Sequence, residues 1–258
     1  MRGIMMRGVI GAAAAAIVFV GLATPATAAE GALPAQDWPF DGVFGSFDRA
    51  ALQRGFQVYQ EVCAGCHGIE YIAFRNLTEI GLNEDQVKAI AAEYEVEGGP
   101  DDEGEMFARP AILSDLLPSP FANDNAARAS NNGALPPDLS LMAKARTGGP
   151  DYLHALLTGY EEAPDDVTLN EGMSYNPYFL GNQIAMPPPL DDDAVEYTDG
   201  TPATVEQMSL DVVNFLMWTA EPKLEVRKRM GIKVILFLLV LTALFYASKR
   251  KVWSDVDH

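Results

Sequence analysis

The apolar residues of this chain form two continuous runs, one near each end, with shorter stripes of helical period between them. The first run covers residues 9–22, follows the basic residues Arg2 and Arg7, and precedes an Ala-x-Ala sequence at 26–28. A basic start, an apolar stretch and small residues at a cleavage site are typical of a secretory signal peptide. We therefore expect residues 1–29 to be removed and the following domain to be exported; an uncleaved N-terminal anchor is the alternative.

The second run covers residues 230–248 and carries one charge, at Lys233. At about 1.5 Å per residue, a helix of this length measures about 28 Å, close to the thickness of the hydrocarbon core of a bilayer. Basic clusters at 227–229 and 249–251 flank the run, which argues against the alternative of a helix buried in a soluble core. We expect a linker and one transmembrane helix over 223–248.

Positive charge on both sides of this helix does not decide its orientation. The signal peptide does, because it directs the domain at 30–222 out of the cytoplasm. Residues 249–258 then form a short cytoplasmic tail. We expect a single-pass protein of the cell inner membrane with its domain on the periplasmic side.

Helical periodicity also marks the two ends of the exported domain. One stripe predicts a helix over 47–63, capped by Ser46, and the glycine near its centre, Gly55, would allow another helix to approach closely. A second stripe begins after a capping box at Thr204 and ends before Pro222. Between them we expect shorter helices over 84–96 after the cap Asn83, after Asp138 and from Pro150, with loops over 97–137 and 161–203. The predicted fold class is mainly α, with long loops and one C-terminal transmembrane helix.

Charge is distributed unevenly along the 258 residues, whose formal net charge is −18. The domain at 30–222 holds 33 acidic and 8 basic residues, and its part at 147–222 holds 14 acidic residues and no Lys or Arg. A nucleic-acid-binding protein is excluded, because it needs a basic face. The acidity either maintains solubility or attracts a basic partner.

Both cysteines of the chain lie in one motif, Cys63-Ala64-Gly65-Cys66-His67. In a C-x-x-C-H sequence the two thiols attach haem through thioethers and the histidine becomes the proximal ligand of the iron. Two cysteines are too few for a disulfide framework or a four-cysteine zinc site. A thioredoxin-type redox pair, the alternative, would follow a βαβ pattern, whereas here a predicted helix precedes the motif. We predict one covalent haem c held by Cys63, Cys66 and His67.

The second axial ligand of that iron has to come from elsewhere in the chain. His154 lies among leucines of a predicted helix, where a core or surface role is commoner than ligation, and His258 falls on the far side of the membrane. Methionine is the usual alternative and raises the reduction potential. With the methionines of the signal, the membrane segment and the last soluble helix set aside, the candidates are Met106, Met142, Met173 and Met186. Three prolines stiffen the chain after Met186, so we favour Met186, with Met173 second.

Haem propionates are anionic and need cationic or hydrogen-bonding partners where they are buried. Lys144 and Arg146 are the last two bases before the base-free stretch, which makes them candidates. Ordinary surface charge is the alternative for both.

Four blocks of the sequence resemble the cytochrome c1 family, the haem subunits of quinol–cytochrome c oxidoreductases. They are RGFQVYQEVCAGCHG around the motif, NNGALPPDLSLMAKARTGGPDYLHALLTGY at 131–160, NPYFLGNQIAMPPPL at 176–190, and the segment at 199–231 that leads into the membrane run. The resemblance implies a c-type cytochrome haem domain, with Met186 as the axial ligand and Asn131, Arg146 and Tyr152 around the propionates. It also implies that the first helix crosses the last soluble one. Family members can carry a disulfide in the acidic region, for which this chain has no cysteines.

The function implied by the resemblance is that of a membrane-anchored electron carrier without a catalytic site of its own. Its haem accepts one electron from a Rieske iron–sulfur protein and passes it to cytochrome c, while the C-terminal helix lies beside a cytochrome b subunit. Acidic residues would steer a basic cytochrome c; those we expect to do so are Glu161, Glu162, Asp165, Asp166, Asp191, Asp192 and Asp193. Two alternatives are a haem enzyme with an open sixth position and an anchored cytochrome c that serves another oxidoreductase.

Overall fold

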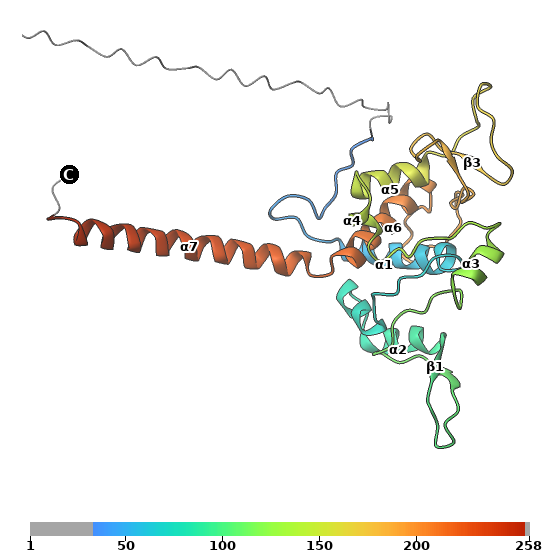
Figure 1. Cartoon of the computed structure of the whole chain (residues 1–258), viewed down its shortest axis with the longest axis horizontal. Helices are drawn as coiled ribbons and strands as arrows, with labels where there is room; N and C mark the ends of the chain where they lie inside the picture. Colours follow the sequence, from blue (N-terminus) through green and yellow to red (C-terminus); the bar gives the residue numbers. More distant parts are fainter. Residues whose placement is uncertain (1–32, 256–258) are drawn as a thin grey trace, which may run out of the picture.

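The computed structural model describes residues 33–255, and its helices and short strands form one body from which a single long helix departs (Figure 1). The predicted signal peptide and its cleavage site lie outside these residues. In chain order the elements are α1 (Arg49–Val58), the π-helix η1 (Tyr59–Cys63), the 3-10 helix η2 (Phe74–Ile80), α2 (Glu84–Ala92), β1 (Glu95–Gly98), β2 (Phe107–Pro110), α3 (Asp124–Ser130), α4 (Met142–Ala145), α5 (Gly149–Thr158), β3 (Ser174–Tyr175), β4 (Gln183–Ile184), α6 (Val205–Ala220) and α7 (Leu224–Val252). The mainly α fold class is confirmed.

The core of the body forms where α1 crosses α6, as the family resemblance implied. The crossing is close because Gly55 has no side chain: a Cβ there would lie 2.0 Å from the carbonyl oxygen of Asp211. Phe56 of α1 and Tyr59, the first residue of η1, pack against Phe215 of α6 with tilted rings, whose centroids lie 5.4 and 5.9 Å from that of Phe215. Aromatic packing around a glycine contact therefore fixes the crossing.

The start of α1 differs from its prediction. Asp48, not Ser46, is the N-cap, because its carboxylate accepts hydrogen bonds from the backbone of Ala50 and Ala51. The regular α-helix ends at Val58, and the chain continues to Cys63 as a π-helix. The last turn before the C-x-x-C-H motif is therefore wider than a regular helical turn.

The other predicted helices form with altered ends. Asn83 caps α2 as expected, through a capping box with Gln86. This helix ends at Ala92 rather than 96, because β1 leaves it to pair antiparallel with β2, Glu95 opposite Pro110. The segment at 97–137 thus contains β2 and α3 as well as loop. The helices expected after Asp138 and from Pro150 are α4 and α5, and both pack on α6.

The first turns of the C-terminal helix α7 contact the body through Leu224, Glu225 and Lys228, and beyond them the helix extends away from the body (Figure 1). It is 29 residues long, its most apolar window has a mean hydropathy of 2.3, and none of that window is buried. A core helix of a soluble domain would be covered by other elements. The length, composition and exposure of α7 fit a transmembrane anchor.

Candidate functional site

The C-x-x-C-H motif folds back over the end of η1. The Ala64 amide donates to the carbonyl of Tyr59 at 2.8 Å, and the amides of Cys66 and His67 both donate to the carbonyl of Cys63 at 3.1 and 2.9 Å. Cys63 is half-buried and Cys66 is exposed. Desolvation, with a smaller contribution from Cys66, raises the pKa of Cys63 to about 12, so its sulfur is a neutral thiol. The two thiols and the imidazole thus lie within one tight turn.

His67 is oriented by two hydrogen bonds. Its Nδ1 donates to the carbonyl oxygen of Pro137 at 2.7 Å, and its own carbonyl accepts from the hydroxyl of Tyr59 at 3.0 Å. None of the described residues engages the other ring nitrogen, Nε2. Desolvation lowers the pKa of His67, against the opposing effects of the Pro137 carbonyl and Asp138. A neutral imidazole with Nδ1 occupied and Nε2 available is the usual state of a metal-binding histidine.

The segment after the motif is held against residues 137–140. The Leu139 amide donates to the carbonyl of Gly68 at 2.8 Å, and the carboxylate of Asp138 accepts from the amide of Glu70 at 2.9 Å. The Tyr71 amide donates to the hydroxyl of Ser140, which is fully buried, at 3.1 Å. No sequence pattern used above assigned these positioning residues, although an aspartate directly after two prolines is typical of a structured turn.

Met186 lies in the extended loop after β4 and is half-buried. The hydroxyl of Tyr160, which follows α5, donates to the carbonyl oxygen of Met186 at 3.1 Å and so fixes this loop to the end of that helix. Three prolines follow Met186 directly and restrict the backbone further. Met186 as an axial ligand stays a prediction.

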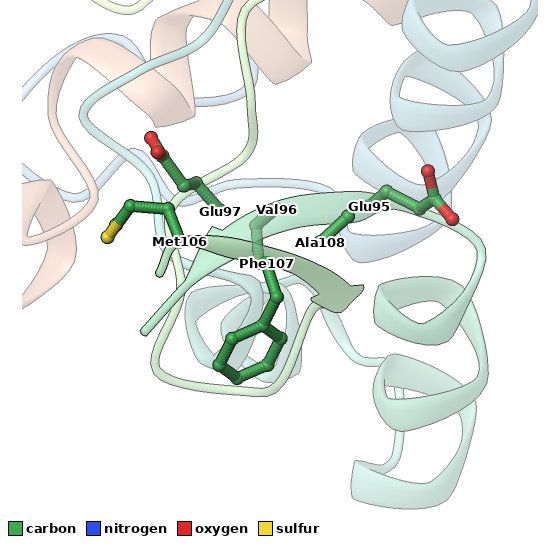
Figure 2. A pocket seen from close by; sticks show the side chains of 6 residues that line it. All are labelled: Glu95, Val96, Glu97, Met106, Phe107 and Ala108. Carbon is green, nitrogen blue, oxygen red and sulfur yellow. The ribbon is translucent and has the colours of Figure 1, made fainter. Parts of the chain in front are cut away.

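Two of the competing methionines have other surroundings. Met106 is 54% exposed and lies on the hairpin of β1 and β2, where it lines a shallow hollow with Phe107, Glu95 and Glu97. Figure 2 shows its side chain directed away from both strands. Met142, the first residue of α4, accepts a hydrogen bond at its sulfur from Nε of Arg146 at 3.2 Å. Met208 is fully buried in the core, as expected for packing.

The residues expected near the propionates come from three helices that follow one another in the chain, α3, α4 and α5. Asn131 caps the end of α3 and donates to the carbonyl of Ala127 at 2.7 Å. Arg146 ends α4, is exposed, and makes no ion pair with a carboxylate of the described residues. Tyr152 lies on α5 and is half-buried. The other basic candidate, Lys144, binds Glu221 at 3.1 Å, so its charge is already paired.

His154 is a core residue rather than a surface one. It is 3% exposed and its ring packs edge-on against Trp38, with centroids 6.3 Å apart. Its Nδ1 lies 3.5 Å from the amide nitrogen of Gln36, and its Nε2 lies 3.2 Å from a carboxylate oxygen of Glu206. Nε2 makes no hydrogen bond with the described residues, so burial and ring packing are what place His154 in the core.

The acidic residues assigned to partner binding lie on loops and are all exposed. They comprise Glu161, Glu162, Asp165 and Asp166 after α5, and Asp191, Asp192 and Asp193 before α6. Asp192 also accepts from the amide of Val205 at the start of α6. No Lys or Arg lies in residues 147–222 to neutralise this surface.

The turn at 63–67 offers the donor set that haem c requires: two thiols and a neutral, oriented imidazole. A helical body with that turn at the end of one of two crossed helices belongs to the class of c-type cytochromes, here with a membrane anchor. Within that class the chain belongs to the cytochrome c1 family, whose model matches residues 38–256. Members of this family carry haem c and transfer electrons as subunits of the bc1 complex.

Three relatives illustrate the similarity. Cytochrome c1 of Rhodospirillum rubrum is 48% identical over 274 residues, which cover 100% of both chains. The mitochondrial cytochrome c1 heme protein of Schizosaccharomyces pombe is 55% identical over 222 residues, covering 86% of this chain and 72% of the relative. The cytochrome b/c1 protein of Bradyrhizobium diazoefficiens is 51% identical over 266 residues, covering 94% of this chain and 39% of that longer protein.

Proposed function

We propose that this chain is the membrane-anchored electron carrier that accepts one electron from a Rieske iron–sulfur protein and passes it to a basic cytochrome c. The observation that carries the proposal is the geometry of His67, whose Nδ1 is bound to Pro137 while Nε2 is available to iron. A bound haem c would supply reversible one-electron chemistry at its iron. The chain itself makes and breaks no substrate bond in this proposal.

Each residue of the turn has a separate task. Cys63 and Cys66 would attach the haem as thioethers. His67 would bind the iron through Nε2, and the carbonyl of Pro137 sets the orientation of its ring. Met186 would supply a thioether as the second ligand, which favours the reduced iron and raises the reduction potential. Asn131, Arg146 and Tyr152 would provide the partners of the propionates.

The acidic surface supports a basic cytochrome c as the electron acceptor. Its carboxylates are exposed and have no basic residue near them in sequence, so their field extends into solvent. Such a field accelerates the encounter with an oppositely charged partner and is screened by salt. The relative in which cytochrome b and c1 form one protein supports a cytochrome b partner for α7.

The signal sequence supports the membrane orientation that we propose. Residues 1–29 direct the haem domain at 30–222 to the periplasmic side. The segment at 223–248 crosses the inner membrane, and residues 249–258 remain in the cytoplasm. The fully exposed apolar surface of α7 supports the crossing.

A redox titration of the haem-loaded chain tests the ligand and the function together. We expect Met186→Leu to lower the reduction potential by on the order of hundreds of millivolts, within the roughly 0.8 V over which axial ligands tune haem. Met173→Leu is the matched control and should leave the potential near that of the unmodified chain. If Met173→Leu lowers the potential and Met186→Leu does not, Met173 is the ligand. If neither changes the potential, the high-potential carrier is the wrong assignment.

Binding of carbon monoxide to the reduced protein separates the carrier from a haem enzyme. A sixth position held by Met186 predicts little binding, whereas an enzyme needs an open or displaceable position. Rapid binding by the unmodified chain would contradict the carrier. Copurification with a b-type cytochrome distinguishes this carrier from an anchored cytochrome c that serves another oxidoreductase.

The rate of electron transfer to cytochrome c tests the acidic surface. We expect the second-order rate constant to fall steeply with ionic strength, and the double variant Glu161→Gln/Glu162→Gln to weaken both the rate and its salt dependence. Glu95→Gln/Glu97→Gln, on the exposed edge of β1 (Figure 2), removes the same charge elsewhere and is the control. A salt-independent rate would overturn this part of the proposal.

A further inference from the structure

The loop before α1 exposes two large apolar side chains at its tip. Val43 is 64% exposed and Phe44 is 86% exposed, whereas the flanking Phe40 and Phe47 are 3% and 6% exposed and belong to the core. The loop is compact: the amide of Ser46 donates to the carbonyl of Pro39 at 2.9 Å. The core residues on both sides thus hold the loop while its apolar tip points outward.

The same loop is fastened to the first turns of α7. Lys228 donates from Nζ to the carbonyl oxygens of Phe40 and Gly45, one on each side of the tip. Glu225, one turn earlier, accepts from the amide of Phe47 at 2.9 Å and pairs with Arg49 at 2.9 Å. The loop therefore keeps a fixed position relative to the membrane anchor.

This position coincides with the level at which the anchor enters the bilayer. Lys228 precedes Val234, the start of the uncharged part of α7, by six residues, which is about 9 Å along a helix. In Figure 1 the chain before α1, drawn in blue, loops out beside the first turns of α7, on the side of the body from which α7 departs. Arg227, Arg229 and Lys233 provide positive charge at the same level, where lipid headgroups lie.

We propose that Val43 and Phe44 insert into the headgroup and acyl boundary of the membrane and form a second contact of the haem domain with lipid. The attachment of this loop to the first turns of α7, just before the membrane run, favours lipid as the occupant. The area of two side chains on one loop is also far below the roughly 800 Å² that each partner buries in a stable protein interface. Aromatic side chains at the level of the headgroups, by contrast, are a common feature of membrane proteins. With α7 alone, the tilt of the body relative to the membrane would be set only by the tilt of that single helix. With this second contact, its tilt relative to the membrane, and hence the height of the haem, is fixed.

A spin label at the tip of the loop tests the inference in the full-length, haem-loaded chain. Phe44→Cys is labelled with a nitroxide after reconstitution into vesicles of phosphatidylcholine, without other subunits. Leu180→Cys is the matched control, since Leu180 is an equally exposed apolar residue at 85% and lies in the turn between β3 and β4. The unmutated chain gives the labelling background from Cys63 and Cys66, and the haem spectrum shows that each variant is folded.

Compared with the label at position 180, we expect the label at position 44 to collide more often with oxygen, which concentrates in lipid. It should collide less often with a nickel chelate, which stays in water. Its oxygen-to-nickel collision ratio should be severalfold above that at position 180. Equal ratios at the two positions would overturn the inference. Protection of position 44 that arises only after cytochrome b is added would also overturn it, because the tip would then be a protein interface. The measurement involves no electron transfer, so its result is independent of the redox partners.

Discussion

Arg54 of α1 donates from Nε and Nη2 to the two carboxylate oxygens of Asp211 on α6, at 2.8 and 2.9 Å. Asp211 is 1% exposed, and its carboxylate also accepts from the side-chain Nε2 of Gln207 at 3.0 Å. The guanidinium makes another ion pair, at 2.9 Å, with Asp199 on the surface. This bidentate pair lies beside the glycine contact and fixes the helix that ends at the C-x-x-C-H motif.

We predict that Asp211→Ala lowers the free energy of unfolding by about 3 kcal/mol, because it leaves a largely buried guanidinium without its main partner. Urea unfolding of the haem-loaded chain, followed by circular dichroism, measures this loss. Asp199→Ala is the matched control for the same guanidinium. The side chain of Asp199 is 43% exposed, so its removal should cost about 0–1 kcal/mol. If the two variants lost equal amounts of unfolding free energy, the buried pair with Asp211 would be no more stabilising than the exposed pair with Asp199.

Gly55→Ala should lower the free energy of unfolding by roughly 2–3 kcal/mol. The added methyl group would lie 2.0 Å from the backbone oxygen of Asp211, so the two helices would have to move apart. Ala50→Leu adds a larger group to the exposed face of the same helix and should change stability by less than about 0.5 kcal/mol. A fully stable Gly55→Ala variant would contradict the close crossing.

Tyr160→Phe removes the hydrogen bond to the carbonyl of Met186 and should loosen the loop that carries the proposed ligand. One hydrogen bond contributes about 1 kcal/mol, so the population with Met186 detached should rise about fivefold. The fraction of reduced protein that binds carbon monoxide measures this population. Tyr178→Phe, a half-buried tyrosine without a hydrogen bond from its hydroxyl among the described residues, should leave the fraction unchanged. No increase in Tyr160→Phe would mean that this bond does not position Met186.

Acid should destabilise the protein in part through Asp115. Its carboxylate accepts from both Nη atoms of Arg109, at 2.6 and 2.9 Å, and from the amide of Ile112, at 2.8 Å. These bonds lower its pKa to about 2, below the value of about 3.9 expected in the unfolded chain. Because the folded-state pKa is the lower one, the stabilisation is complete above about pH 4 and is lost as the pH falls towards 2.

Asp115→Asn should therefore flatten the decline in the free energy of unfolding between about pH 4 and pH 2. Asp102→Asn removes one negative charge from an exposed position in the preceding loop and serves as the control. Asp199 also has its pKa lowered to about 2, mainly by the amide and hydroxyl of Thr201, so some acid sensitivity should remain. An unchanged slope in Asp115→Asn would contradict the assignment.

Local sequence was sufficient for the features that depend on spacing along the chain. The C-x-x-C-H motif identified the turn at 63–67, and the family that the four sequence blocks indicated was confirmed. The cap at Asn83 and the helix after Thr204 also follow from neighbouring residues alone. The predictions that were wrong concern the ends of elements. Asp48, not Ser46, caps α1, and α2 ends before residue 96 because β1 pairs with β2.

The sequence by itself determined the C-x-x-C-H turn, the apolar C-terminal helix and the excess of acidic residues, because each is encoded by residues close together in the chain. Only the tertiary structure decided which groups from distant parts of the chain form hydrogen bonds with these segments. The acceptor of His67 is a carbonyl 70 residues away, and the donor to the Met186 carbonyl is a hydroxyl 26 residues away. Lys228 joins the base of α7 to a loop 183–188 residues earlier. Backbone carbonyls are present at every residue, so no sequence pattern shows which of them the fold will bring to a given side chain.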